Sequence, residues 1–130
     1  MKQVLPLVAF VLLVFSSCKA QQFTPAGSDR GVDVSYRWKH APGKPSELLL
    51  KLVNTADSAR TVHVGLDLYY QGLTVEQFSA DTCIRAGRTM NGKLNGFYFV
   101  PQAVTPEQAE GPDVRVEMTG INAIPVAECP

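Results

Sequence analysis

Apolar and polar residues alternate along much of the chain from position 32 onward. Val32, Val34, Tyr36 and Trp38 are apolar, and a polar residue follows each of them. A period of two predicts a strand with one face buried and the other in solvent. The cleanest stretch of this kind runs from 61 to 70. The almost entirely apolar run at 48–53 predicts a more central strand.

The rest of the chain adds short extended segments between turn residues. One helical turn is expected at Thr105–Gln108, where Thr suits the N-cap, Pro the first helical position and Gln the third position of a capping box. Pro125 marks the last extended segment as an edge or bulged strand. About seven short strands predict an all-β fold, an antiparallel β-sandwich. The further segments expected to be extended are 73–78, 82–84, 97–100, 114–118 and 121–127.

The N-terminal segment has a different character. Lys2 precedes the apolar run Val4–Phe15, and two serines and Cys18 follow it. The run is shorter than the roughly 20 residues of a membrane-spanning helix, and the layout is that of a secretory signal. We therefore expect a cleaved leader, a tether without periodicity and one sandwich domain, at 1–20, 21–31 and 32–130.

The junction Phe15-Ser16-Ser17-Cys18 resembles a bacterial lipobox, in which a small residue precedes a cysteine that is diacylated and becomes the mature N-terminus. The family usually has Leu where this chain has Phe15. The resemblance implies a lipid on Cys18 and an exported, outer-membrane or periplasm-facing lipoprotein of the Bacteroidetes type, held without a spanning helix. No acidic residue follows directly, which favours the periplasmic face. Cleavage after Ala20, giving a secreted soluble protein, is the alternative.

Three segments are similar to the accessory immunoglobulin-like or fibronectin-type sandwiches of bacterial envelope proteins. They are the run Leu48–Asn54, the long strand up to Tyr70 and the stretch Cys83–Gly87. The resemblance implies an immunoglobulin-like architecture. Immunoglobulin domains place a tryptophan between their two cysteines, whereas Trp38 precedes both in this chain.

Cysteine usage agrees with export. Whether Cys18 is acylated or removed with the leader, the domain keeps Cys83 and Cys129, and such a pair in an oxidising compartment is usually a disulfide. Charge is uninformative, because the chain has 12 basic and 12 acidic residues and no basic run. We expect no nucleic-acid binding and no polybasic membrane site, so that the lipid anchor is the expected membrane contact.

Motif searches predict no catalytic site, metal or cofactor. Gly87–Lys93 nearly spells a phosphate-binding loop, but Leu94 stands where that loop needs Ser or Thr, so a glycine-rich turn is expected. His63 and Asp67 share a strand face, yet four residues of strand separate them by about 13 Å, too far for one metal ion. No serine is recognisably placed against either histidine.

Outward tyrosines are the remaining candidates for a ligand-binding surface. Tyr69 and Tyr98 are expected to face away from the core, because their neighbours in the strand pattern face inward. Asp113 and Glu117, with Arg115 between them, are expected to be ordinary charges on an exposed strand face.

Together these features favour an exported, lipid-anchored, non-enzymatic domain that binds a protein or another envelope component, or serves a structural role. The alternative is a periplasmic inhibitor or chaperone-like module that uses a sheet edge or the loop Gly87–Gly96. A small hydrolase acting through His63 and Asp67 is the third hypothesis.

Overall fold

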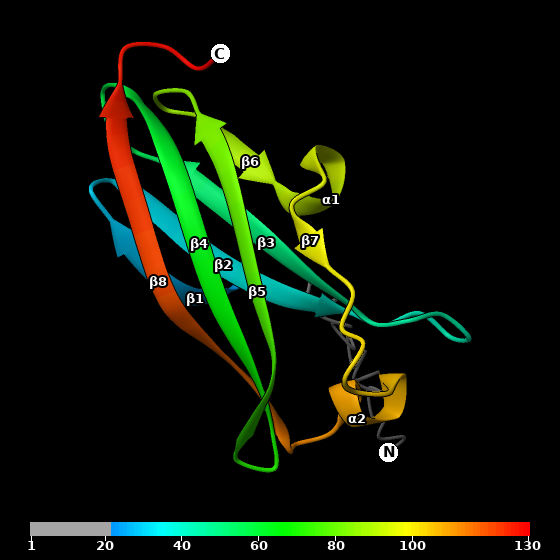
Figure 1. Cartoon of the computed structure of the whole chain (residues 1–130). Coiled ribbons are helices and arrows are strands. Elements are labelled where there is room, and N and C mark those ends of the chain that lie inside the picture. Colours follow the sequence, from blue (N-terminus) through cyan, green and yellow to red (C-terminus); the bar gives the residue numbers. More distant parts are fainter. Residues whose placement is uncertain (1–21) are drawn as a thin grey trace, which may run out of the picture.

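The strands pair into two antiparallel sheets that pack face to face (Figure 1). The computed structural model describes residues 22–130, so the predicted leader and Cys18 lie outside the described residues. The predicted all-β sandwich is confirmed. Within residues 22–130, no helix combines the length and the apolar character that crossing a membrane requires.

In the first sheet, called sheet A, three consecutive strands form a meander, and two short strands pair along the free side of the third. Its strands are ordered β1-β2-β3-β6, and β7 pairs with the other half of β3. The bounds are β1 Thr24–Asp29, β2 Val32–Lys39, β3 Glu47–Asn54, β6 Thr89–Asn91 and β7 Tyr98–Phe99.

The second sheet, called sheet B, has the order β5-β4-β8. Its strands are long: β4 covers Ala59–Tyr70, β5 covers Leu73–Ile84 and β8 covers Val114–Val126. The central β4 carries the cleanest alternation in the sequence, which agrees with its place between two partners. Leu48, Leu50 and Leu52 of β3 face Val62, Val64, Leu66 and Leu68 of β4 in one core, and all seven are at most 1% exposed.

Two short helices connect the strands. Helix α1 (Gly92–Asn95) joins β6 to β7, and α2 (Pro106–Glu110) precedes β8. The predicted capping box of α2 is confirmed: Thr105 accepts a hydrogen bond from the backbone N–H of Gln108, and the Gln108 side chain accepts one from the backbone N–H of Thr105. The segment Gly87–Lys93, expected to be a glycine-rich turn, holds the end of the Arg85–Arg88 turn, then β6 and the start of α1.

The predicted tether at 21–31 is wrong, because residues 24–29 form strand β1. This strand shows no apolar period, since backbone pairing with β2 and a bulge between Pro25 and Gly27 hold it in place. At its end, Asp29 accepts a hydrogen bond from the backbone N–H of Ala123, and Arg30 donates to the Ala123 carbonyl. Both contacts attach the β1–β2 turn to β8.

Two pairs of predicted segments merge into single strands. Segments 73–78 and 82–84 both belong to β5, and segments 114–118 and 121–127 meet in β8. A register shift between Gly65 and Leu66 on β4 absorbs the extra residue at Thr119–Gly120, where the sequence pattern breaks. The prediction for Pro125 is confirmed, because it lies on β8, an edge strand of sheet B.

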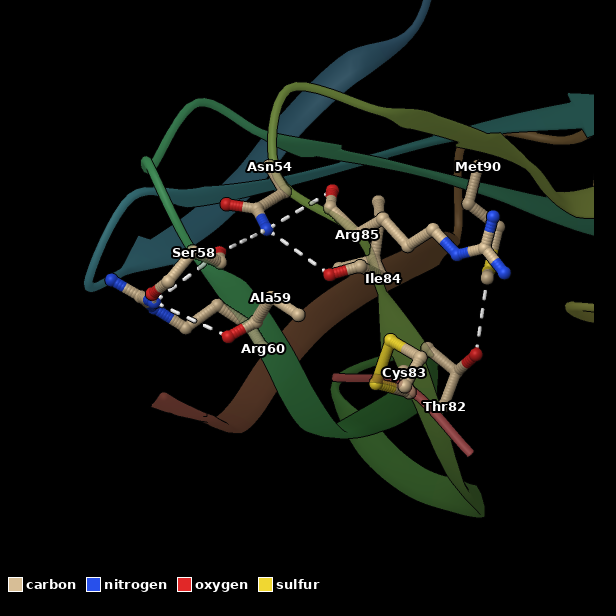
Figure 2. Close-up of a disulfide and its surroundings, with 10 residues drawn as sticks. Asn54, Ser58, Ala59, Arg60, Thr82, Cys83, Ile84, Arg85 and Met90 are labelled. Atoms are coloured by element: carbon tan, nitrogen blue, oxygen red, sulfur yellow. Dashed lines mark hydrogen bonds between the residues drawn. A yellow bond between two sulfur atoms is a disulfide. The ribbon is translucent and has the colours of Figure 1, made fainter. Parts of the chain in front are cut away.

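The two cysteines of the domain form a disulfide (Figure 2). Cys83 lies on β5, at one edge of sheet B, and Cys129 lies in the tail beyond β8, at the other edge. Figure 1 shows the tail turning over the end of the sheet to reach β5. The bond therefore closes the C-terminal tail across the end of β4.

Asn54 is a buried polar residue that joins three segments. It is 1% exposed, and its Nδ2 lies 3.0–3.2 Å from the carbonyl oxygens of Ser58, Ile84 and Arg85 (Figure 2). Its Oδ1 accepts a hydrogen bond from the backbone N–H of Ala56. One side chain thus connects the end of β3, the β3–β4 turn and the end of β5.

Candidate functional site

A hollow of about 510 Å³ lies between the β2–β3 loop and the segment that contains α2. One wall consists of Pro42, Gly43 and Pro45, which lie in the loop that connects β2 to β3. Pro101 and Pro106 belong to the opposite wall. Four prolines therefore restrict the backbone on both sides, so the hollow is largely preformed.

The chemistry of this hollow is mixed. Buried Val104 and Ala109 contribute apolar surface. Lys44 extends from one wall, while Glu107 and Glu110 extend from the other, and all three side chains are exposed. Apolar surface with a few charged groups around it is typical of a surface that takes up a ligand or a peptide segment.

Beside the hollow, His40 stands between three side chains. The Trp38 ring stacks on the imidazole with the centroids 5.7 Å apart, and the Ser46 Oγ lies 2.7 Å from His40 Nδ1. Glu110 Oε1 lies 3.9 Å from the same nitrogen. This pairing was not predicted from the sequence. Hairpin register gives the signal for it, since Lys39 pairs with Glu47 and the next residues outward are His40 and Ser46.

This geometry does not make a nucleophilic triad. In a triad the hydroxyl bonds to one ring nitrogen and the acid orients the other, whereas Ser46 and Glu110 both approach Nδ1 of His40. Ser46 is only 4% exposed, and its Oγ is engaged with His40 Nδ1. The cluster instead fixes the base of the hairpin loop.

The two tyrosine candidates lie on opposite sides of the molecule. Tyr69 points outward from sheet B, where the Arg115 guanidinium lies 5.3 Å from its ring centroid. Tyr98 pairs with Leu49 on the outer side of sheet A, and Lys93 Nζ lies 4.3 Å from its ring centroid. The structure therefore does not bring them into one site.

The residues of the hydrolase hypothesis are also separated. His63 pairs with Asp81 on the neighbouring strand, at 2.7 Å between Nδ1 and Oδ1. Asp67 is 9% exposed and lies in register between Gln77 and Glu117. In the part of the chain that is described, no group of three His, Cys, Asp or Glu residues could hold a metal ion.

The remaining charged pair behaves as expected of an exposed strand. Arg115 and Glu117 lie two residues apart on β8 and form an ion pair of 3.1 Å. Asp113 precedes β8, and its backbone carbonyl accepts a hydrogen bond from Gln71 N–H. Asp113 and Glu117 therefore contact different residues, Gln71 and Arg115.

The loop Gly87–Gly96 is tied to sheet A. β6 pairs with β3, and Lys93 Nζ lies 2.7 Å from both carboxylate oxygens of Glu47. This hydrogen bond lowers the pKa of Glu47 and raises the pKa of Lys93. Next to Lys93, Leu94 is 87% exposed. The loop thus holds one apolar side chain out into solvent.

On the outer side of sheet A, basic side chains lie over aromatic rings. Phe23, which immediately precedes β1, lies under the Arg37 guanidinium and the Lys51 ammonium, at 5.1 and 5.5 Å from its ring centroid. Lys93 lies over Tyr98 on the same sheet. This basic patch is not visible in the sequence, because every second residue of β2 and β3 faces inward and separates the basic residues along the chain.

Searches against family models, curated proteins and solved structures find no match to this chain.

Proposed function

We propose that this protein is an exported, lipid-anchored, non-enzymatic binding module of the cell envelope. Its partner is a protein segment that occupies the hollow between the β2–β3 loop and α2. The observation that carries the proposal is the preformed hollow of about 510 Å³ with proline-rich walls. A rigid site loses little conformational entropy on binding, which favours affinity.

The composition of the hollow supports a peptide segment as the occupant. Val104 and Ala109 supply apolar surface, and Lys44 faces two glutamates from the other wall. A segment with an apolar residue flanked by charges of both signs complements this arrangement. The disulfide supports export, because such bonds persist in oxidising compartments.

A pull-down with matched variants tests the site. The Glu107→Lys/Glu110→Lys protein reverses the charge of one wall of the hollow, and Asp81→Lys/Glu117→Lys makes the same net change on sheet B. We expect the wild type and the sheet B variant to retain the same envelope protein, identified by mass spectrometry, and the hollow variant to lose it by about tenfold or more. Equal retention by all three, or no reproducible partner, would contradict the proposed site.

The anchor is tested separately, on the protein purified from its native host. We expect the mature chain to begin at Cys18 with two or three acyl chains, measured as the mass of the N-terminal peptide. A chain that begins at Gln21 would establish ordinary cleavage. A chain that retains Met1, with free thiols at Cys83 and Cys129, would remove the case for export.

One observation favours the alternative of an inhibitor-like module that presents the loop Gly87–Gly96. Leu94 is 87% exposed on a turn held by Lys93 and Glu47, and a rigid apolar side chain is a suitable anchor for a partner's pocket. Under this alternative, Leu94→Ser abolishes partner capture in the same pull-down, whereas the Glu107→Lys/Glu110→Lys variant still captures the partner. The two functions therefore give opposite results.

A further inference from the structure

We infer that the outer side of sheet A is a second membrane contact, which lies against an anionic phospholipid surface when the protein is anchored. The inference deepens the proposed function and rests on the anchor at Cys18. It revises the sequence expectation that the lipid alone contacts the membrane. Three observations lead to it: the place of Phe23, the distribution of charge between the two sheets, and the type of side chains on this side.

Phe23 fixes where the N-terminal segment meets the fold. Its ring lies on the outer side of sheet A, within 5.5 Å of both Arg37 on β2 and Lys51 on β3. Phe23 follows Cys18 by five positions, with four residues between them, and five steps along the chain span at most about 18 Å when fully extended. Lipid on Cys18 is therefore confined to the neighbourhood of Phe23.

This length is too short to place the opposite side of the molecule on the membrane. The path from Phe23 to the outer side of sheet B crosses at least one further strand, about 5 Å, and the space between the sheets, about 10 Å. The side chains of both outer faces lengthen that path further. Little of the reach of about 18 Å then remains to bring the acyl groups to the bilayer, whereas sheet A can lie directly on it.

The two outer faces also differ in charge. Strand register and the contact of Lys93 with Tyr98 place four basic and two acidic side chains on sheet A, and the Lys93–Glu47 ion pair cancels one charge of each sign. Sheet B presents three acidic side chains against one arginine. The sheet A residues are Arg37, Lys39, Lys51, Lys93, Asp33 and Glu47; the sheet B residues are Asp67, Asp81, Glu117 and Arg115. The face nearest the anchor is thus the one that an anionic surface attracts.

The side chains on this face suit the boundary between lipid headgroups and water. Phe23 and Tyr98 each carry a cation over the ring, and aromatic rings with nearby cations favour the interfacial layer. Each Lys or Arg beside an anionic surface strengthens binding by about fivefold. Such an affinity is weak for a free protein, but a tether of four residues between Cys18 and Phe23 keeps the face close to the membrane.

Vesicle binding tests the face without the anchor. The chain from Cys18 onward contains every described element, and Cys18→Ser removes its thiol. We expect this protein to co-sediment with vesicles of phosphatidylcholine and phosphatidylglycerol, more weakly at high salt, and not with phosphatidylcholine alone. Lys39→Gln/Lys51→Gln should weaken binding by about 25-fold. Arg85→Gln/Arg115→Gln removes the same charge elsewhere and should change binding less than about twofold.

A tethered experiment tests the orientation. Because Cys83 and Cys129 are bonded to each other, Cys18 can be coupled alone to a maleimide lipid in the same vesicles. We expect Lys39 and Lys51 to become protected from acetylation, while carboxylate labelling of Asp81 and Glu117 stays as in the free protein. Protection of the sheet B carboxylates, equal loss in both double variants, or binding to purified peptidoglycan instead of vesicles would overturn the inference. The coupling is chemical, so a host protein without lipid would refute the proposed anchor and leave this result standing.

Discussion

Serine at both Cys83 and Cys129 is expected to lower the free energy of unfolding by about 4 kcal/mol. The disulfide closes a loop with a sequence separation of 46 residues, and without it the unfolded chain gains the entropy of that loop. The total free energy of unfolding of a protein is about 5–15 kcal/mol, so the disulfide supplies a large part of the stability. Urea denaturation followed by circular dichroism measures the change.

Reduction of the wild type supplies the control, because it removes the bond without changing either residue. The reduced wild type and the double serine variant should have nearly the same midpoint. A loss below about 1 kcal/mol would mean that the C-terminal tail contributes little to holding β5 and β8, which would contradict the view that the bond closes the end of sheet B.

Replacing Asn54 with alanine is expected to cost about 2–3 kcal/mol of unfolding free energy. The change removes the Asn54 donor from the buried Ile84 carbonyl and the Oδ1 acceptor from the Ala56 N–H. The Ser58 and Arg85 carbonyls still accept hydrogen bonds from Arg60 and from the backbone N–H of Arg88. Each buried polar group left without a partner costs about 1–3 kcal/mol. Because these contacts span both sheets, the loss should appear as cooperative unfolding at lower denaturant concentration.

Thr55 offers a neighbouring control. Its hydroxyl donates to the Gly31 carbonyl in an exposed position, and Thr55→Ala should cost about 1 kcal/mol or less. If Asn54→Ala were as mild as Thr55→Ala, water would be replacing the lost amide, and Asn54 would not be a buried junction between β3 and β5.

The strands of the core could be predicted from the sequence because burial imposes a period of two. Residues 32–39 alternate and coincide with β2. Residues 61–70 alternate and lie within β4. β1 could not be predicted in this way. Its residues Thr-Pro-Ala-Gly-Ser-Asp are held by backbone bonds and by Asp29, and such contacts leave no hydrophobic pattern.

The candidate sites were less accessible to sequence reasoning, since they combine distant segments. The wall formed by α2 and the β2–β3 loop are far apart in the sequence, and only the folded chain brings them together. The pairing of His40 with Ser46 was within reach, because strand register extends to the residues just outside the hairpin. In the sequence Asn54 only ends the run Leu48–Asn54, and the folded chain alone reveals that β5 ends beside it.

The contacts of Asp29 and Arg30 with Ala123 have a consequence for self-association. They occupy the outward backbone groups of β8 at that residue, and two positions further on, Pro125 has no N–H to offer an incoming strand. The outward edge of β5 is 12 residues long and pairs with no other strand in residues 22–130. If copies meet through sheet B, they join β5 to β5 about a two-fold axis. The remaining edge of each copy, β8, is blocked at Ala123 and Pro125, which opposes further growth of the sheet into a fibre through that part of β8.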